Sequence, residues 1–228
     1  ATRVSTRGLT SGGRLYVFAS NGQVLPGWPK NLNNNNVSSG VVAVDLDGDG
    51  KLEILAQERR YPIGYVHAFR MDGTPVGGSW PLALDHVPAM TPAVGDLDGD
   101  GKIEIVIGSY NSIYVTDAQG RVRTGFPVDV STRSANFSYQ SPALGDIDGD
   151  GKLEIVTACH KSAGGCYVFR ENGTIQTGFP KSFGGWTYSP PVLVDLDGNG
   201  RLDILCGRAG GPVANSTMYA WTGAGASI

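Results

Sequence analysis

The stretch Asp45-Leu-Asp47-Gly-Asp49-Gly-Lys-Leu-Glu53-Ile54 occurs in four closely similar copies in this chain of 228 residues. The later copies begin at Asp96, Asp146 and Asp195, so that successive copies lie 51, 50 and 49 residues apart. A fixed period of this length is typical of solenoids and propellers, in which each repeat is one structural unit stacked against the next. The spacing therefore predicts an array of equivalent units, each with one acidic turn.

The composition of the repeated block predicts a calcium loop. Calcium prefers six to eight oxygen ligands, and carboxylates at alternate positions converge on one point when the backbone curls around it. Each copy has acidic or amide side chains at positions one, three and five and a glycine at position six for the sharp turn. Position seven offers a backbone carbonyl, and position nine offers a further carboxylate. The alternative interpretation is a set of metal-free Asp-Gly hairpin turns, but clustered carboxylates repel one another without a cation.

An EF-hand is excluded by the twelfth position of the block, where that motif needs a glutamate. The residues there carry no carboxylate: Ala56, Ile107, Thr157 and Cys206. A β-rich run follows each loop instead of a helix. In the fourth copy Asn199 replaces the third aspartate, so we predict weaker calcium binding there.

The acidic balance of the chain comes mainly from these loops. They contain 15 of its 21 acidic residues, and the formal net charge is −3. Four bound Ca²⁺ would change that charge to +5. The arginines are scattered, so nucleic-acid binding is not expected. The carboxylates within each loop repel one another without a metal ion and are attracted to a bound cation. Calcium is therefore expected to raise the melting temperature of the folded protein.

The segments between the loops predict four short strands per unit. The first strands precede the loops, at 41–44, 92–95, 142–145 and 191–194, and the second strands follow the loops. The third strands are expected at 65–69, 113–116, 166–169 and 218–221, and each fourth strand is expected to end at an aromatic-proline pair. The second strands are apolar on both faces, which fits sheets covered on both sides. The predicted fold is an all-β β-propeller of four-stranded antiparallel blades, with a calcium loop between the first and second strands.

The chain is expected to form a single propeller domain or a fragment of one, over residues 1–228. The predicted units are approximately 1–36, 37–87, 88–136, 137–187 and 188–228. The first unit aligns with a later unit only from the second strand onward, and the last unit stops in its fourth strand. About five units are therefore expected, with the first and last incomplete.

The acidic block and the Pro-Ala-Val-Gly strand before it closely resemble the FG-GAP and VCBS repeats. These repeats form calcium-binding β-propellers in integrin α-subunit heads, in a group of fungal lectins and in many secreted bacterial proteins. The resemblance covers essentially the whole chain, although integrin-like propellers have seven blades and this chain encodes fewer than five. It implies one calcium site per loop, with the following ligands: Asp45, Asp47, Asp49, Lys51 and Glu53; Asp96, Asp98, Asp100, Lys102 and Glu104; Asp146, Asp148, Asp150, Lys152 and Glu154; Asp195, Asp197, Asn199, Arg201 and Asp203. Position seven of each set contributes its carbonyl.

Two groups of aromatic residues are candidates for further roles. The first precedes a proline in each unit, at Trp28, Trp80, Phe126 and Phe179. Identical placement favours packing between blades over a repeated sugar-stacking platform. The second group varies between units and lies in the connections between blades, so Trp186, Tyr139 and Phe137 are candidates for a ligand-binding rim.

The cysteines leave one question open. Cys159 ends a second strand and Cys166 begins the third strand of the same unit, so a disulfide between them is as plausible as two free thiols. Cys206 is then expected to be a small buried residue.

The predicted function is recognition or adhesion outside the cell, where millimolar calcium suits loops of this kind. No zinc motif, nucleophile elbow or phosphate loop is present, so no enzyme activity is expected. The ligand is expected to be a glycan, bound in a lectin-like manner, or an extracellular protein. The alternative is an accessory propeller domain of a larger secreted enzyme that degrades protein or polysaccharide. Neither a signal segment nor a membrane-inserting stretch is recognised.

Overall fold

The computed structural model describes residues 3–7, 13–32, 40–133, 135–137, 140–160, 164–183, 187–208 and 216–228. Within these residues every paired strand is antiparallel, and the helical content is one short 3-10 turn, η1 (Ser131–Arg133). No helix in the described part is long and apolar enough to cross a membrane. The all-β prediction is therefore confirmed.

The strands form five sheets, which we number 1 to 5 along the chain. Sheet 1 contains β1 (Arg3–Arg7), β2 (Gly13–Phe18) and β3 (Lys30–Leu32). Sheet 2 contains β4 (Val42–Val44), β5 (Glu53–Arg60), β6 (Ile63–Arg70) and β7 (Leu82–Leu84). Sheet 3 contains β8 (Ala93–Gly95), β9 (Glu104–Gly108), β10 (Ser112–Thr116) and β11 (Val128–Asp129). Sheet 4 contains β12 (Asn136–Phe137), β13 (Ala143–Gly145), β14 (Glu154–His160), β15 (Gly165–Phe169) and β16 (Lys181–Ser182). Sheet 5 contains β17 (Val192–Val194), β18 (Asp203–Arg208) and β19 (Thr217–Thr222).

The first and third strands occur where the sequence predicts them. The first strands are β4, β8, β13 and β17, and each begins one residue later than expected. The third strands are β6, β10, β15 and β19, and each contains the predicted range. In sheets 2 to 5 the second strand pairs with the first and third strands, and in sheet 4 the short strand β12 also pairs with the second strand, β14.

The fourth strands lie later in the chain than the sequence predicted. The aromatic-proline pair was expected to end each fourth strand, but β3, β7, β11 and β16 begin after the proline. Before the proline the chain makes a single bridge to the third strand, such as Phe69 with Pro75. A turn then follows, and the proline, which lacks an N–H, precedes the regular pairing that its ring would interrupt.

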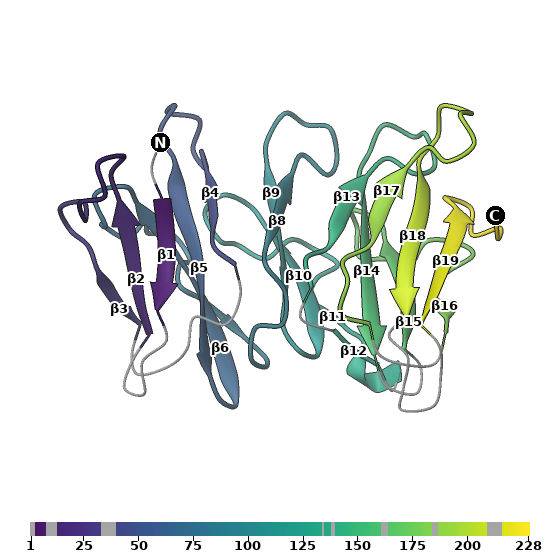
Figure 1. The fold of residues 1–228 in the computed structure, drawn as a ribbon, viewed down its shortest axis with the longest axis horizontal. Coiled ribbons are helices and arrows are strands. Elements are labelled where there is room, and N and C mark those ends of the chain that lie inside the picture. Colours follow the sequence, from purple (N-terminus) through teal and green to yellow (C-terminus); the bar gives the residue numbers. More distant parts are fainter. Residues whose placement is uncertain are drawn as a thin grey trace.

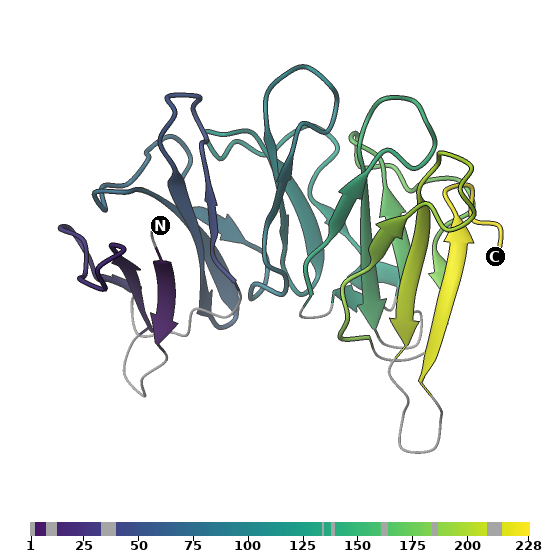
Figure 2. The same ribbon diagram turned by 45° about the horizontal axis from the view of Figure 1, so that its top comes forward.

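The five sheets stand side by side along an arc, with the two termini at opposite ends (Figures 1 and 2). Neighbouring sheets share a hydrophobic cluster, and the second strands β5, β9 and β14 contribute to a cluster on each of their two faces. Pairs from neighbouring sheets that share a cluster are Leu15 and Ile54, Leu55 and Ile105, Val106 and Ile155, and Val156 and Ile204. The core is thus a series of layers between sheets, which explains the two-sided apolar pattern of the second strands.

The aromatic-proline residues pack between sheets, as predicted. Trp28 and Trp80 are 8% and 7% exposed, and both belong to clusters shared with the following sheet. The indole nitrogen of Trp28 donates to the carbonyl of Met71 at 2.8 Å. That of Trp80 donates to the carbonyl of Ala118 at 3.1 Å. Each tryptophan is thereby attached to the turn after the third strand of the next sheet.

The cysteine pair considered from the sequence is not bridged. Cys159 lies opposite Gly165, and Cys166 lies opposite Ala158, so the two cysteines are offset by one residue in the ladder. Because side chains alternate along a strand, the two thiols lie on opposite faces of sheet 4 and in different clusters. All three cysteines are free and buried, as predicted for Cys206.

Candidate metal centres

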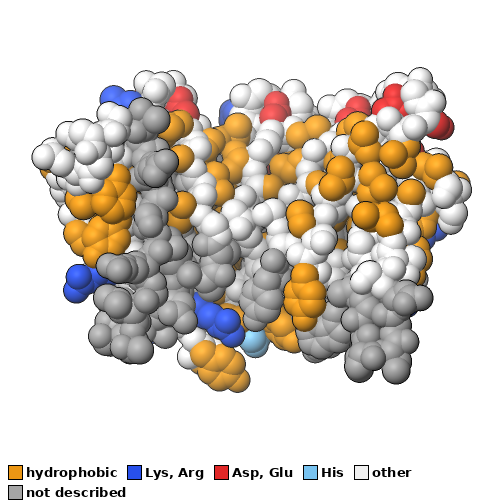
Figure 3. All heavy atoms as spheres, viewed as in Figure 1, with side chains coloured by type: hydrophobic (Ala, Val, Ile, Leu, Met, Phe, Trp, Pro, Cys, Tyr) orange, Lys and Arg blue, Asp and Glu red, His pale blue; other side chains and the backbone are white. Residues whose placement is uncertain are grey.

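Each acidic loop joins the first strand of a sheet to the second. The loops connect β4 to β5, β8 to β9, β13 to β14 and β17 to β18, and they lie along one edge of the arc (Figure 1). In the space-filling view the acidic side chains gather on that same upper edge (Figure 3). The repeat therefore places four equivalent acidic turns on one side of the molecule.

The first aspartate organises the backbone of each loop. One carboxylate oxygen of Asp45 accepts the Gly48 N–H at 2.7 Å, and the other accepts the Gly50 N–H at 2.8 Å. Both glycines have a positive φ, 77° and 82°, which the curl of the chain requires and which glycine adopts without steric cost. The same two contacts recur from Asp96, Asp146 and Asp195.

Carboxylates at positions one, three and nine converge in all four loops. In each group one oxygen per residue lies within 4.8 Å of the others. The groups are Asp45, Asp47 and Glu53; Asp96, Asp98 and Glu104; Asp146, Asp148 and Glu154; and Asp195, Asp197 and Asp203. The position-nine residue is buried in every group, while the aspartates are more exposed.

Position five does not belong to these groups. The Asp49 carboxylate accepts the backbone N–H of Lys51 at 2.8 Å and the Lys51 ammonium at 3.0 Å. These hydrogen bonds lower the pKa of Asp49, and Lys102 acts on Asp100 in the same way. Asn199 keeps only the backbone contact, to Arg201 at 2.8 Å. The position-five oxygens thus fix the turn in this structure.

The remaining side chains at positions five and seven differ between loops. Asp150 accepts the backbone N–H of Lys152 at 2.9 Å, but the Lys152 ammonium pairs with Glu171 at 2.7 Å. The Arg201 guanidinium donates to the backbone carbonyl of Asp148, in the neighbouring loop, at 3.4 Å. In the third and fourth loops the position-seven side chain therefore contacts a group outside its own loop, as expected of residues whose predicted ligand is the carbonyl.

The buried carboxylate of Glu154 is only half satisfied. Its Oε2 accepts the Ile147 N–H at 3.0 Å, whereas its Oε1 is buried without a hydrogen-bond partner. Burial raises the pKa of Glu154 to about 7, and repulsion from Asp148 and Asp150 adds to that rise. Burial likewise raises the pKa of Glu53 and Glu104. A buried, unpartnered carboxylate oxygen beside two further carboxylates is an arrangement that a cation would complete.

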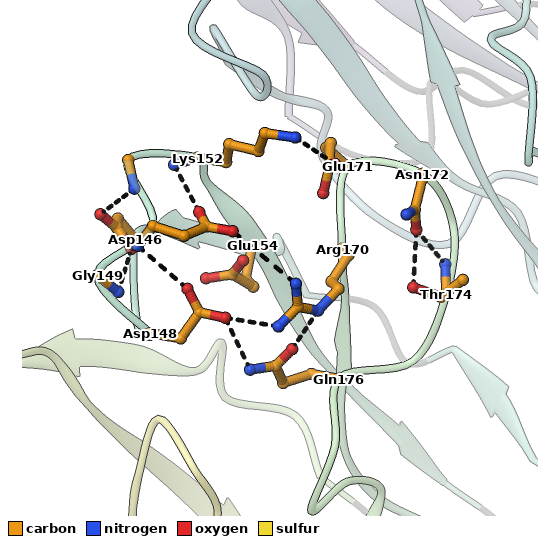
Figure 4. Close-up of polar contacts among 12 residues, drawn as sticks. Asp146, Asp148, Gly149, Lys152, Glu154, Arg170, Glu171, Asn172, Thr174 and Gln176 are labelled. Carbon is orange, nitrogen blue, oxygen red and sulfur yellow. Dashed lines mark hydrogen bonds and ion pairs between the residues drawn. The ribbon is translucent and has the colours of Figure 1, made fainter.

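Two arginines reach into the second and third loops. Arg123 pairs with Asp98 and lies 2.8 Å from the Glu104 carboxylate. Arg170 lies 2.6 Å from Asp148, whose carboxylate also accepts from Gln176 at 3.1 Å (Figure 4). Sequence reasoning missed these arginines because they come from different positions of the unit. Arg170 directly follows the third strand β15, whereas Arg123 aligns with Gln176 in the following turn.

The donor set fits a hard divalent cation. All converging atoms are carboxylate oxygens, which suit calcium or magnesium and not a soft metal. The residues that converge to hold the ion in this structure are those at positions one, three and nine, and the sequence adds the position-five side chain and the position-seven carbonyl as predicted ligands. Bound there, the ion would offset three or four negative charges and engage the unpartnered oxygen of the buried glutamate.

The predicted ligand rim is not found as a group. Phe137 was expected to face a ligand, but it is fully buried between sheets 3 and 4. The two-residue strand β12 pairs with β14, which turns its ring into the core. Tyr139 and Trp186 lie outside the described residues. The most exposed aromatic side chain described is Tyr61, at 78%, in the tight turn between β5 and β6. The Tyr61-Pro62 pair was the feature of the sequence that could have indicated an exposed aromatic residue in a turn.

Comparison with family models gives one match. The model of the FG-GAP-like repeat matches residues 4–56, 96–157 and 146–206. A search of curated proteins finds no match. The matched segments together cover well over half of the chain.

Comparison with solved structures gives distant likenesses. The chain is 13% identical to the C-terminal domain of PilY1 from Pseudomonas aeruginosa, with a TM-score of 0.64. The match covers 99% of this chain and 60% of that domain. BBS1N, in a complex with ARL6DN, is 12% identical with a TM-score of 0.55 over 99% of this chain and 66% of that one. The Vibrio cholerae biofilm matrix protein Bap1 is 21% identical with a TM-score of 0.41, over 85% and 39%. The chain thus spans less than two-thirds of each of these three structures.

Proposed function

The chain belongs to the FG-GAP-like repeat family, and we propose that it is an extracellular recognition module whose sheets are propeller blades stabilised by four Ca²⁺ ions. The observation that carries this proposal is the fourfold convergence of three carboxylate oxygens within 4.8 Å at the start of each second strand. Four such groups on one edge exceed what turn formation requires. Calcium is the ion we assign because it accepts irregular, all-oxygen coordination by loops.

The proposed role of calcium is structural. Each loop links the first strand of a sheet to the second strand, which carries buried core residues. An ion bound there would fix the hairpin whose second strand carries the core contacts. The carboxylates are then engaged in binding the ion, and we assign no catalytic step to them. The partly exposed aspartates suit weak sites that fill at extracellular calcium concentrations.

Calcium titration of the chelated protein tests this proposal. Isothermal titration calorimetry is expected to give four sites, and a saturating excess of calcium is expected to raise the melting temperature. Asp146→Ala should remove one site, because Asp146 is the first residue of the third loop. Asp72→Ala is the matched control, since Asp72 lies outside the loops and accepts only from Thr74. An unchanged melting curve and no calcium uptake in the wild type would refute the proposal.

The proposed ligand surface lies around Tyr61. Its ring meets that of His86 edge-on at 6.1 Å between centroids, and His86 is 5.1 Å from Tyr110. Pro88 packs directly on Gly64 of β6, so closely that a Cβ at Gly64 would lie 2.3 Å from the proline ring. This contact holds the Tyr61 hairpin against the segment that leads into sheet 3. The exposed ring of Tyr61 offers an apolar face with a polar tip, and we take a glycan as the ligand that packs on it.

A glycan array with wild type and Tyr61→Ala tests the ligand assignment. Tyr61→Ala is expected to lower binding at least tenfold without changing the melting temperature. Tyr188→Ala is the matched control, because Tyr188 is also largely exposed but lies at sheet 5. Binding to protein partners alone would replace the glycan by an extracellular protein as the ligand.

A further inference from the structure

Two cysteines from neighbouring sheets meet inside the core. Cys166 is in β15 of sheet 4, and Cys206 is in β18 of sheet 5. They are 0% and 1% exposed and belong to the same hydrophobic cluster, with Ile204 and Trp221. The neighbouring thiol of Cys206 and burial both raise the pKa of the Cys166 thiol. Two cysteines separated by 40 positions in the sequence are therefore packed into the same cluster between sheets 4 and 5.

This contact follows from the repeat. The equivalent positions at the boundary between sheets 1 and 2 are Leu15 and Ala56, which share one cluster. At the boundary between sheets 2 and 3 they are Val66 and Ile107, which also share a cluster. The third strand of one sheet thus meets the second strand of the next at a fixed point. The repeated stacking of one sheet on the next therefore places Cys166 and Cys206 in one cluster.

We propose that Cys166 and Cys206 form a disulfide that fastens sheet 4 to sheet 5 when the chain folds in the presence of a disulfide oxidant. The thiolate of one cysteine attacks the oxidant, forms a mixed disulfide and releases one thiol. The second cysteine attacks the mixed disulfide and releases the other thiol. Two S–H bonds break and one S–S bond forms within the protein. The two protons and two electrons end on the two thiols of the reduced oxidant.

The burial of the two thiols determines at which stage of folding the disulfide forms and how readily it is reduced. Both thiols are closed off from solvent, so the oxidant must reach them before sheet 5 has packed onto sheet 4. Once formed, the bond is shielded from reductants by the same burial. It closes a loop of about 40 residues, a length at which loop-closure entropy predicts substantial stabilisation.

Cys159 is the internal control. It is also fully buried, but its thiol is on the other face of sheet 4, in the cluster shared with sheet 3. The geometry therefore assigns one bridge and one free thiol to the three cysteines. It also predicts which of the three possible pairings occurs.

Refolding of the whole chain with oxidised and reduced glutathione, in saturating calcium, tests the proposal. After denaturation and alkylation of the remaining thiols, peptide mapping should find Cys166 linked to Cys206 and Cys159 alkylated. The oxidised form should melt about 5–10 °C above the form with dithiothreitol. Cys159→Ala should keep this difference, and Cys206→Ala should abolish it. The mapping itself needs only wild type, so a variant that fails to fold does not obscure the result.

Two outcomes would overturn the proposal. One is alkylation of all three cysteines in protein that has regained its native near-ultraviolet circular dichroism. The other is a bridge that includes Cys159. The extracellular setting of the proposed function supplies the oxidant in the organism, but the experiment supplies it directly. Calorimetric calcium binding is measured on the same sample, so failure of the bridge and failure of the calcium sites are distinguished.

Discussion

The guanidinium of Arg170 lies 2.6 Å from the carboxylate of Asp148, the third-position residue of the third acidic loop. It is also 3.8 Å from the carboxylate of Asp150. A positive side chain thus stands beside carboxylates that repel one another without a metal ion. In the second loop Arg123 holds the corresponding place. Among the described residues, no ion pair joins an arginine to the fourth loop.

Arg170→Gln is expected to destabilise the calcium-free protein by about 1 kcal/mol, because it removes the counter-charge of a partly exposed loop. In saturating calcium the loss should be smaller, since the ion then neutralises the same carboxylates. Urea denaturation with chelator and with calcium measures both values. Arg121→Gln is the control, because Arg121 pairs with Asp117 outside the loops. Equal losses in the two conditions for Arg170→Gln would show that the arginine acts only through packing.

Asn199→Asp is expected to strengthen calcium binding by the fourth loop by about three- to tenfold, because affinity rises with ligand charge. Asn199 holds the Arg201 N–H as Asp49 holds that of Lys51, so the loop needs no rearrangement. Calorimetry on the chelated protein should show the weakest site becoming similar to the others. Asp150→Asn makes the reverse change in the third loop and should create a second weak site. A titration unchanged by both substitutions would remove position five from the set of ligands.

Periodic features of the sequence were enough to predict the loops and most strands. The carboxylates at positions one, three and nine recur at fixed spacing, and each loop forms the same turn from its own residues. Features that depend on contacts between units were not predictable. Arg123 and Arg170 reach equivalent carboxylates from non-equivalent positions. Phe137 is buried by a two-residue strand too short to leave a pattern. Cys166 faces sheet 5 and not Cys159, because the two cysteines are offset by one residue in the ladder between β14 and β15. The sequence of such short strands does not specify this register.

Ile105→Ala is expected to cost about 2–5 kcal/mol of unfolding free energy. Ile105 is fully buried in the cluster between sheets 2 and 3, while its neighbour Val106 is buried on the opposite face. Val192→Ala is the control on a first strand, where the side chain is 53% exposed. It should cost less than about 0.5 kcal/mol. Denaturation in saturating calcium isolates this difference from metal binding. Similar costs at the two positions would argue against cores formed between sheets.

Gly125→Ala is expected to destabilise the protein strongly, for two separable reasons. Gly125 has a φ of 93°, and a Cβ there would lie 2.0 Å from the backbone carbonyl oxygen of Asn172 in the next sheet. Gly22 has a similar φ of 83° but nothing within 4 Å of the added carbon. Gly22→Ala therefore measures the backbone cost alone, about 1–2 kcal/mol.

The excess cost of Gly125→Ala over Gly22→Ala measures the close approach between neighbouring sheets. Backbone atoms cannot rotate away as a side chain does, so the sheets must move apart or the turn at Asn172 must shift. We expect an excess of at least about 2 kcal/mol, in the range of overpacking. The same approach recurs where Gly27 meets Asp72 and Gly178 meets Ala224. Urea denaturation of both variants in saturating calcium provides the measurement. Equal losses for the two variants would mean that the turns are not in contact in solution.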